Sequence, residues 1–313
     1  MSGSTVVALS GGVGGAKLSL GLLRTVPAGA LTVIVNTGDD FEHLGLTICP
    51  DIDTTLYTLA GIANPELGWG RRDETWTFMR VMESLGGETW FRLGDGDLAM
   101  HIERTRRLAA GESLSAVSAD LARRLGIGAV IVPMSDQPVR TVIQTAQGEL
   151  AFQDYFVRRR CEPELTGVRF AGAARAAPAP TALAALTAPT LAAILLCPSN
   201  PYLSIDPLLA IPGLKSALQA AHAPVIAVSP LVGGAAVKGP TAKIMRELGV
   251  TLTPASIAEH YADVIDALVL DERDAGAAAG LRCPVHVCNT LMASLADREA
   301  LAREVLAFAR RLG

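Results

Sequence analysis

The sequence predicts an α/β fold built on a doubly wound, mostly parallel sheet of the Rossmann type. Short apolar runs recur along the chain, and each is followed by turn residues and then by a stretch of helical character. Strands and helices that alternate in this way form parallel sheets with right-handed crossovers. With 313 residues, half of them hydrophobic and 19% charged, the chain is long enough to bury a sizeable core.

Seven of the apolar runs are short and flanked by Gly, Pro or Asn, which is typical of strands covered on both faces. The predicted strands are 5–9, 31–35, 129–132, 191–196, 225–228, 267–270 and 285–287. The predicted helices are 16–25, 97–110, 113–124, 242–248, 256–261 and 296–312. Open sheets of this kind bind ligands outside the carboxyl ends of their strands, so the loops after the strands are the candidate site.

Two stretches depart from the alternation. Residues 51–125 look mainly helical, and residues 140–170 contain two β-rich runs that Gly148 separates, as in a hairpin. No repeat or linker divides the chain. We therefore expect residues 1–313 to form a single α/β domain, with a smaller helical and hairpin lobe drawn from about 51–170.

Composition and charge exclude several classes of protein. The net charge is −4 and no basic stripe compensates for it, so we expect neither nucleic acid nor an anionic membrane as a partner. The five scattered cysteines are odd in number, which favours reduced thiols in a cytoplasmic protein. The first apolar run is too short for a signal peptide, and no run matches a membrane span.

The first predicted strand leads into a glycine-rich turn, "SGGVGGAKLSL". Neither familiar phosphate-binding pattern fits, because Lys17 stands where the dinucleotide fingerprint needs a small residue and Leu18 where the P-loop needs Ser or Thr. Glycine backbones, a helix N-terminus and a lysine still favour an anion. The residues expected to hold a phosphate are Gly11, Gly12, Gly14, Gly15 and Lys17. The alternative is a tight turn without a ligand.

Acidic residues gather after the second predicted strand. The cluster comprises Asn36, Asp39, Asp40, Asp51 and Asp53. A hard cation such as Mg²⁺ takes one or two carboxylates together with phosphate oxygens and water, which this cluster can supply. We expect a site for Mg²⁺ and phosphate, although Asp51 or Asp53 could instead cap a helix.

Two later loops have a similar character. "CPSNPYLSIDP", with Ser199 and Asn200, follows the strand at 191–196, and "SPLVGGAAVKGPTAK", with Gly233, Gly234 and Lys238, follows the strand at 225–228. Two glycine-rich, lysine-bearing turns at one sheet edge suggest a ligand with more than one phosphate. Taken alone, Ser199 and Asn200 fit a plain turn equally well.

Two further stretches hold candidates. In "GGETWFRLGDGDL", Trp90 and Phe91 could pack in the core or stack on a ligand. In "PMSDQPVRT", Arg140 could bind a carboxylate or phosphate, or form a salt bridge with Asp136. A Ser-His-Asp triad finds no support, because no G-x-S-x-G occurs.

The chain resembles the 2-phospho-L-lactate transferase family of coenzyme F-420 biosynthesis, of the CofD or FbiA type. The resemblance rests on nine blocks in the family's order: "LSGGVGGAKL", "VNTGDDFEHLGL", "PDIDTTLYTLAG", "NPELGWG", "WFRLGD", "PMSDQPVRT", "FQDYFVRRR", "PSNPYLSI" and "SPLVGGAAVKGPTAK". The blocks span nearly the whole chain, which makes the resemblance specific.

The resemblance implies an activity. Family members transfer a phospho-acid from a guanylylated diphosphate donor to the ribityl hydroxyl of 7,8-didemethyl-8-hydroxy-5-deazariboflavin (Fo), and they release GMP. They require Mg²⁺ and are typically homodimers. In the family's pattern the metal carboxylates correspond to Asp39 and Asp51, with Asp40 and Asp53 as the nearest competitors. The phospho-acid stays open between 2-phospho-L-lactyl, enolpyruvyl and 3-phosphoglyceryl groups.

The remaining motif residues take roles from the same resemblance. Asn36, Asp40 and the glycine loop with Lys17 would bind the phosphates of the donor. The guanylyl side would be lined by Ser199, Asn200, Gly233, Gly234 and Lys238. Contacts to the deazaflavin acceptor would come from Trp90, Met134, Ser135 and Arg140.

Two other functions compete with this hypothesis. A nucleotide- or nucleotide-sugar-binding regulatory protein of the same fold would keep the glycine loop and the "NTGDD" turn, but "PMSDQPVRT", "FQDYFVRRR" and "NPELGWG" resemble the transferases. An NAD-dependent oxidoreductase is disfavoured by Lys17 and by Asn36 and Thr37, which stand where an acidic residue would end the second strand.

Overall fold

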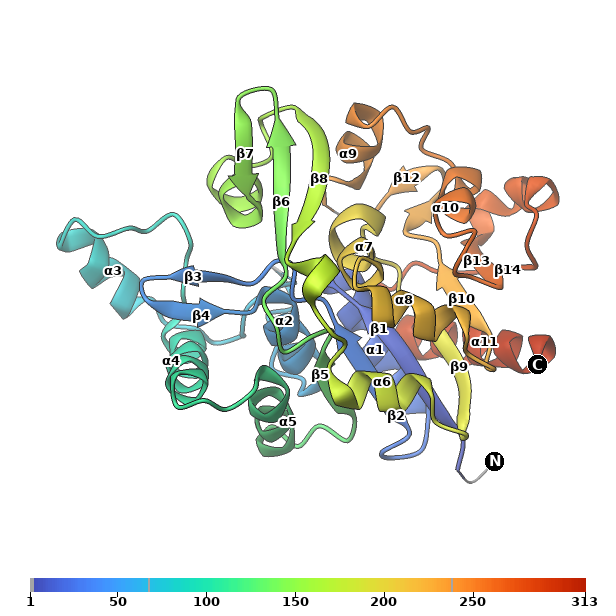
Figure 1. Ribbon diagram of the computed structural model, residues 1–313, viewed down its shortest axis with the longest axis horizontal. Coiled ribbons are helices and arrows are strands. Elements are labelled where there is room, and N and C mark those ends of the chain that lie inside the picture. The colour runs from blue at the N-terminus through green and yellow to red at the C-terminus, as the bar shows by residue number, and fades with distance from the viewer. Residues whose placement is uncertain (1–2, 67, 238) are drawn as a thin grey trace.

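A seven-stranded parallel sheet forms the centre of the protein in the computed structural model, which describes residues 3–66, 68–237 and 239–313 (Figure 1). The strand order is β14-β13-β10-β9-β1-β2-β5. The strands are β1 (Thr5–Ser10), β2 (Leu31–Val35), β5 (Val130–Pro133), β9 (Leu191–Leu196), β10 (Val225–Val228), β13 (Ala267–Asp271) and β14 (Val285–Cys288). All neighbouring pairs are parallel, so the predicted α/β class is confirmed.

All seven predicted strands are present, and their ends agree with the prediction to within one residue. The strands β10 and β13 are buried along their whole length. Strands covered on both faces are apolar at nearly every position, and this makes them easy to recognise between turn residues.

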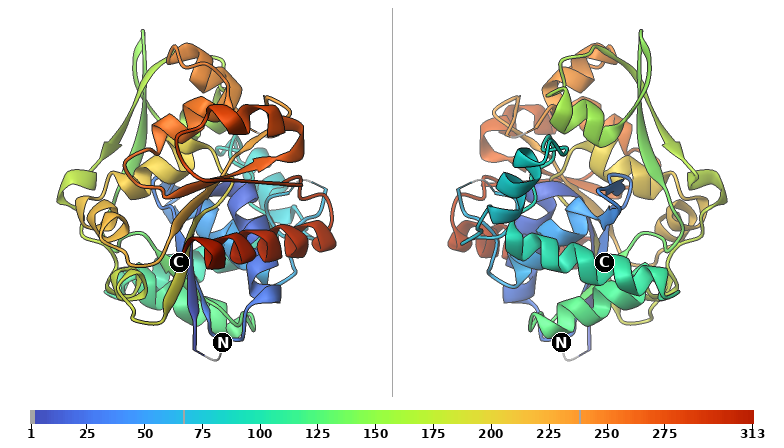
Figure 2. Two further views of the ribbon diagram at one scale, coloured as in Figure 1. Left: turned by 90° about the vertical axis from the view of Figure 1, so that its right-hand side faces the viewer. Right: turned by 90° about the vertical axis from the view of Figure 1, so that its left-hand side faces the viewer.

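Helices cover both faces of the sheet, so each face has its own hydrophobic core. Val7 and Leu9 of β1 point into one core, and Val6 and Ala8 point into the other. The second core is covered by α1 (Gly12–Thr25), α2 (Pro50–Leu59), α5 (Leu114–Arg124) and α11 (Leu295–Leu312). The first is covered by α6 (Pro180–Leu186), α7 (Asp206–Leu209), α8 (Pro212–Gln219), α9 (Thr241–Glu247) and α10 (Pro254–His260). The left view of Figure 2 shows α11 and α8 on opposite sides of the sheet.

The helix prediction was less complete than the strand prediction. The stretch predicted as mainly helical contains α2, α3 (Thr77–Ser84), α4 (Asp95–Ala109) and α5. Three unpredicted helices, α6, α7 and α8, lie where prolines interrupt the sequence. Each has a proline at its first or second position, where the missing N–H costs nothing. No helix among the described residues is long and apolar enough to cross a membrane.

Three small antiparallel sheets lie outside the central sheet. The predicted hairpin at Gly148 is present as β6 (Arg140–Thr145) and β7 (Gly148–Ala151), and β8 (Leu165–Ala171) pairs with the other side of β6. The hairpin of β3 (Phe41–His43) and β4 (Leu46–Ile48) was not predicted, because strands of three residues leave no pattern. A third hairpin joins β11 (Leu231–Val232) to β12 (Ala235–Ala236).

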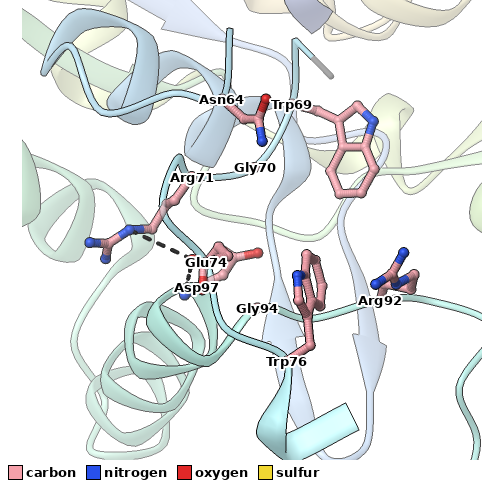
Figure 3. Close-up of a pocket in the computed structure, with 9 residues that line it drawn as sticks. All are labelled: Asn64, Trp69, Gly70, Arg71, Glu74, Trp76, Arg92, Gly94 and Asp97. Atoms are coloured by element: carbon pink, nitrogen blue, oxygen red, sulfur yellow. Dashed lines mark hydrogen bonds and ion pairs between the residues drawn. The ribbon is translucent and has the colours of Figure 1, made fainter. Parts of the chain in front are cut away.

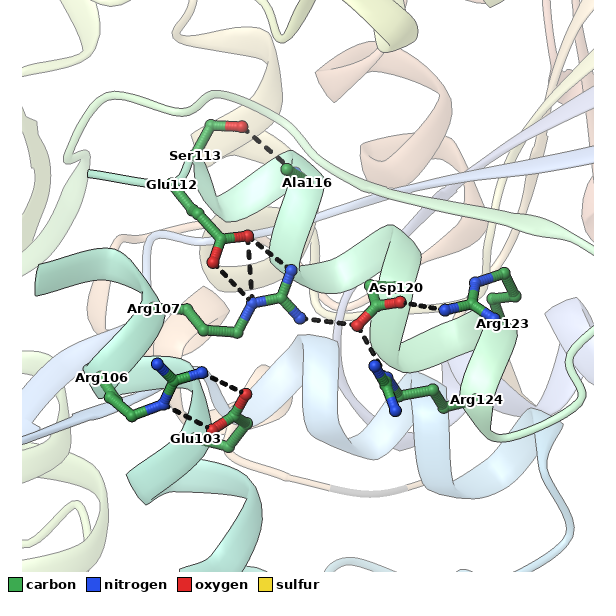
Figure 4. A network of polar contacts seen from close by, with 9 residues as sticks. All are labelled: Glu103, Arg106, Arg107, Glu112, Ser113, Ala116, Asp120, Arg123 and Arg124. Atoms are coloured by element: carbon green, nitrogen blue, oxygen red, sulfur yellow. Dashed lines mark hydrogen bonds and ion pairs between the residues drawn. The ribbon is translucent and has the colours of Figure 1, made fainter. Parts of the chain in front are cut away.

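A network of charged side chains fastens α4 to α5 (Figure 4). Arg107 of α4 donates to Glu112 in the connecting loop and to Asp120 of α5. Arg123 and Arg124 bind the same Asp120 carboxylate. Most of these groups are exposed, so the network fixes the mutual orientation of the two helices more than it adds stability.

Candidate active site

A cavity of about 630 Å³ opens at the carboxyl edge of the central sheet. Its polar wall is made by the loops that follow β1, β2, β9, β10 and β14. These loops contribute Gly11, Gly12, Gly14, Asp39, Ser199, Asn200, Ser229, Thr290 and Met292. The chain leaves the neighbouring strands β1 and β9 in opposite directions, towards β2 and β10. Such a switch point is the usual ligand-binding position of a doubly wound sheet.

The glycine-rich turn is the first turn of α1, which begins at Gly12 and not at residue 16 as predicted. A Cβ atom at Gly14 would lie 2.1 Å from the carbonyl oxygen of Pro198, and one at Gly11 would lie 2.6 Å from Cβ of Ser204. The glycines therefore let α1 approach the loop after β9. Gly11, Gly12 and Gly14 line the cavity, whereas Gly15 is buried against Ser10.

Lys17 lies one turn further along α1 and lines the cavity. Its Nζ atom donates a hydrogen bond to the backbone oxygen of Met292, at 3.0 Å. Met292 is in the loop after β14, so this contact joins the beginning of the chain to its end. The lysine thereby brings a positive charge to the polar wall.

Two of the predicted carboxylates, Asp39 and Asp51, face the cavity. Asp51 is held rigidly: its Oδ1 atom accepts the Gly12 N–H at 2.8 Å, and its Oδ2 atom accepts the side-chain amide of Asn36 at 2.9 Å. Asn36 is fully buried behind the cavity and does not line it. Among the described residues, no hydrogen-bond partner reaches Oδ1 of Asp39.

Burial makes these acidic groups hard to ionise. Burial, together with the nearby charges of Asp51 and Asp40, raises the pKa of Asp39 well above its usual range. Burial raises the pKa of Asp51 to about 6, although hydrogen bonds from Asn36 and from the Gly12 N–H oppose it. Burial also raises the pKa of Asp40 to about 7 against the charge of Arg140. A cation held between Asp39 and Asp51 would stabilise the ionised form of both carboxylates.

Asp53 turns away from the cavity. The guanidinium of Arg104, on α4, binds both of its carboxylate oxygens. Asp53, Asp97 and His101 lie close enough together to resemble a metal site. The fully buried Arg104 already neutralises Asp53, and Asp97 accepts the Tyr57 hydroxyl and lies 3.3 Å from His101. Both carboxylates of this second cluster therefore already have protein partners.

Another part of the cavity wall is aromatic. It is formed by Trp69, Trp90, Phe91, Phe152 and Phe156. Trp90 packs edge-on against His43 of β3, with ring centres 5.1 Å apart. Phe152 and Phe156 stack on each other at 5.2 Å. Trp90 and Phe91 were expected from their motif, whereas Phe152 and Phe156 were not. Their spacing of four residues was the available signal.

Three of the residues expected to contact the acceptor lie elsewhere. Met134 is fully buried in the hydrophobic core. The Ser135 hydroxyl donates to the backbone oxygen of Ala177 at 2.7 Å. Arg140 donates to the backbone oxygens of Val139 and Thr37. None of the three is part of the cavity lining that the structure describes.

The predicted residues of the loop after β9 line the cavity, whereas Gly233 and Gly234 of the loop after β10 do not. Ser199 and Asn200 line the cavity; Ser199 donates to the backbone oxygen of Gly11 at 2.6 Å, and Asn200 caps the π-helical turn Pro201–Ile205. The N–H groups of Gly233 and Gly234 bind the carboxylate of Asp274 at 2.9 and 2.7 Å. Lys238 lies outside the described residues. Ser204, Ser229 and Thr290 also line the cavity, and the motifs gave no reason to select them.

Comparison with known proteins identifies the family. A family model described as 2-phospho-L-lactate transferase CofD matches residues 6–283. The chain belongs to the CofD family. The resemblance seen in the sequence is therefore confirmed, and with it a transferase of the coenzyme F-420 type.

Similar proteins carry two different names within this family. The phosphoenolpyruvate transferase of Kitasatospora aureofaciens is 42% identical, with 98% of each chain covered. The 2-phospho-L-lactate transferase of Methanosarcina barkeri is 38% identical, over 96% of this chain and 97% of that one. A crystal structure of a UPF0052 family member from Bacillus halodurans aligns with a TM-score of 0.62. It covers 98% of this chain and 99% of its own at 14% identity, and this shows the fold alone.

Proposed function

We propose that this CofD-family protein transfers a phospho-acid from a guanylylated diphosphate donor to the ribityl hydroxyl of Fo, and that it releases GMP. The phospho-acid is the 2-phospho-L-lactyl, enolpyruvyl or 3-phosphoglyceryl group. One observation carries the proposal: Asp39 and Asp51 face a cavity at the switch point of the sheet, beside the N-terminus of α1. Carboxylates and a helix N-terminus together suit a metal-bound diphosphate.

The donor would lie along the polar wall. The first turn of α1 carries backbone N–H groups without intrahelical partners and the positive end of the helix dipole. Lys17 adds a full charge on the same side. Ser199 and Asn200, in the loop after β9, would contact the guanylyl half.

The acidic groups fit a Mg²⁺ ion. Oδ1 of Asp39 has no partner among the described atoms. Burial and the neighbouring acidic charges raise the pKa of Asp39, and a cation would offset the acidic charges. Asp39 and Asp51 would hold the ion, and Asn36 would keep the Asp51 carboxylate oriented. When bound, Mg²⁺ would neutralise charge on the diphosphate and on the departing GMP.

Phosphoryl transfer depends on positioning and charge neutralisation more than on covalent catalysis. The Fo hydroxyl oxygen would form a bond to the phosphorus that bears the phospho-acid, while the bond from that phosphorus to the GMP oxygen breaks. The hydroxyl proton would leave to water or to a carboxylate of the site. The aromatic wall with Trp90 and Phe156 would hold the deazaflavin ring and aim its ribityl chain at the donor.

A mass-spectrometric assay tests the proposal. The purified protein receives Fo, Mg²⁺ and each of the three guanylylated donors separately. We expect one donor to give the phospho-acid adduct of Fo together with GMP. EDTA and the variants Asp39→Asn and Asp51→Asn should abolish the product. Asp263→Asn is the control, because Asp263 is an exposed carboxylate that pairs with Lys215 and is not part of the described cavity lining.

A different result would favour the rival function. If GMP binds but none of the donors reacts with Fo, the protein is a nucleotide-binding regulator.

We also propose that the protein is a cytoplasmic homodimer. Light scattering at micromolar concentration measures the assembly, and a monomer mass would contradict it.

A further inference from the structure

Arg92 stands out among the charged groups of the cavity. In the lining that the structure describes, Lys17 and Arg92 are the two cationic side chains. Lys17 belongs to the polar wall, whereas Arg92 directly follows Trp90 and Phe91 of the aromatic wall. Arg92 and Trp69 also line a small adjoining depression together with Trp76 (Figure 3).

The Arg92 guanidinium is held by stacking alone. Its central carbon lies 4.2 Å from the centre of the Trp76 ring. Among the described residues, no hydrogen bond or ion pair to Arg92 is found. Stacking fixes the plane of a guanidinium and leaves its N–H groups for water or a ligand. Arg92 is therefore oriented without being neutralised.

Neighbouring charges are already paired, and this sets Arg92 apart. Glu74 accepts the N–H groups of Gly96 and Asp97 at 2.7 and 2.8 Å, and its carboxylate lies 3.7 Å from Arg71. Asp97, the other carboxylate of this depression, accepts the Tyr57 hydroxyl and lies 3.3 Å from His101. Both carboxylates therefore have other partners than Arg92. Arg158, which is not part of the described lining, lies 5.7 Å from the centre of the Trp90 ring. Within the described lining, Arg92 is thus the oriented positive charge of the aromatic end.

We propose that Arg92 binds the negatively charged, oxygen-bearing edge of a planar heteroaromatic acceptor; this rests on the proposed function. An 8-hydroxy-5-deazaflavin that loses its hydroxyl proton spreads the charge through its conjugated rings to the carbonyl and nitrogen of the pyrimidine edge. Two acceptor atoms side by side in one plane match the fork of a guanidinium. With the ring against Trp90, Arg92 would select the ionised form of the acceptor.

The proposal is tested by binding Fo in the absence of any donor. The Kd for Fo and the apparent pKa of bound Fo are measured from fluorescence and absorbance across pH 5–9. We expect Arg92→Gln to weaken binding of ionised Fo about tenfold, as for a lost charge-assisted hydrogen bond. The apparent pKa of bound Fo should rise. Arg92→Lys keeps the charge but lacks the forked guanidinium. Its Kd for Fo should lie between those of the wild type and of Arg92→Gln.

Arg80→Gln is the matched control, because Arg80 is an exposed arginine of α3 outside the cavity lining. GMP affinity and the melting temperature should be unchanged in all of these variants. If Arg92→Gln binds Fo with unchanged Kd and pKa, the proposal is overturned. It is equally overturned if Arg92→Gln weakens binding of the donor and leaves binding of Fo unchanged, since Arg92 would then bind the donor's carboxylate.

Failure of the proposed function gives a separate result. If wild-type protein binds ionised Fo through Arg92 but transfers no phospho-acid, the transfer reaction fails and the Arg92 proposal stands. If wild-type protein does not bind Fo at all, both are overturned.

Discussion

Arg104 and Asp53 form a buried ion pair that joins α4 to α2. Nη1 of Arg104 lies 3.1 Å from Oδ2 of Asp53, and the Arg104 side chain is fully buried. The same guanidinium contacts the backbone oxygen of Thr47 and the ring of His101. Asp51 and Asp53 both lie in the first turn of α2. By fixing Asp53, the ion pair therefore also fixes the part of the helix that carries the cavity-facing Asp51 carboxylate.

We expect Arg104→Met to destabilise the protein by about 3–5 kcal/mol, because it leaves the buried Asp53 carboxylate without compensation. Urea unfolding followed by circular dichroism measures the loss. The double variant Arg104→Met/Asp53→Leu should recover most of it, since an apolar pair replaces the ionic one. Arg106→Met, which removes an exposed ion pair with Glu103 on the same helix, is the control. Equal losses for Arg104 and Arg106 would contradict the prediction.

The raised pKa of Asp40 predicts how stability changes with pH. Its pKa is about 7 in the folded protein and about 4 in an unfolded chain, so the folded state binds more protons between these values. Stability from this group is therefore present at low pH and is lost as the pH rises from about 4 to 7. Asp40→Asn should flatten this part of the profile and raise the melting temperature at pH 8 by roughly 2–5 °C. A variant profile that is parallel to the wild-type one would refute the assignment.

Gly14→Ala should damage both stability and nucleotide binding. The new Cβ atom would meet the carbonyl oxygen of Pro198, and a backbone atom cannot move aside cheaply. We expect a loss of about 1–3 kcal/mol, as for overpacking in a core, together with weaker GMP binding in calorimetry. Gly276→Ala, where a Cβ atom meets nothing within 4 Å, is the control. Unchanged GMP affinity in Gly14→Ala would show that α1 tolerates displacement.

Phe156→Ala should weaken binding of the acceptor Fo and leave binding of the donor unchanged. Phe156 is 39% exposed and lies in the aromatic wall stacked on Phe152. Loss of one aromatic contact of about 0.5–1.5 kcal/mol predicts a KM for Fo about two- to tenfold higher, with the KM for the donor unchanged. Leu85→Ala, at a side chain that is 76% exposed, is the comparison. A rise in the donor KM would place Phe156 on the wrong side of the cavity.

The sequence predicted the sheet well and the site only in part. Strands such as β10 are apolar throughout because both faces are covered, so their pattern is unmistakable. The start of α1 was missed because glycines disfavour helices, and here the need for close contact with Pro198 overrides that preference. Met134 was expected at the ligand, yet it ends up in the core. Which face a residue takes at the end of a strand depends on packing partners that come from elsewhere in the chain.

Long-range pairing explains the other differences. The hydrogen bond between Asn36 and Asp51 and the contact between Gly233 and Asp274 depend on how separate loops meet. The secondary-structure propensity of a short segment carries no information on contacts between separate loops. The loop at Gly233 therefore looked like a phosphate cradle in the sequence, although its N–H groups bind a carboxylate of the same protein.

The position of β1 between β2 and β9 has a consequence for biosynthesis. β1 leaves the ribosome long before its partner β9, which begins only at Leu191, and Lys17 meets Met292 later still. A growing chain must therefore keep an open edge at β1 and an unfinished cavity until β9 and the loop with Met292 have been synthesised. Pairing over such separations also slows folding. We expect chaperone dependence to be greatest in nascent chains that end before β9.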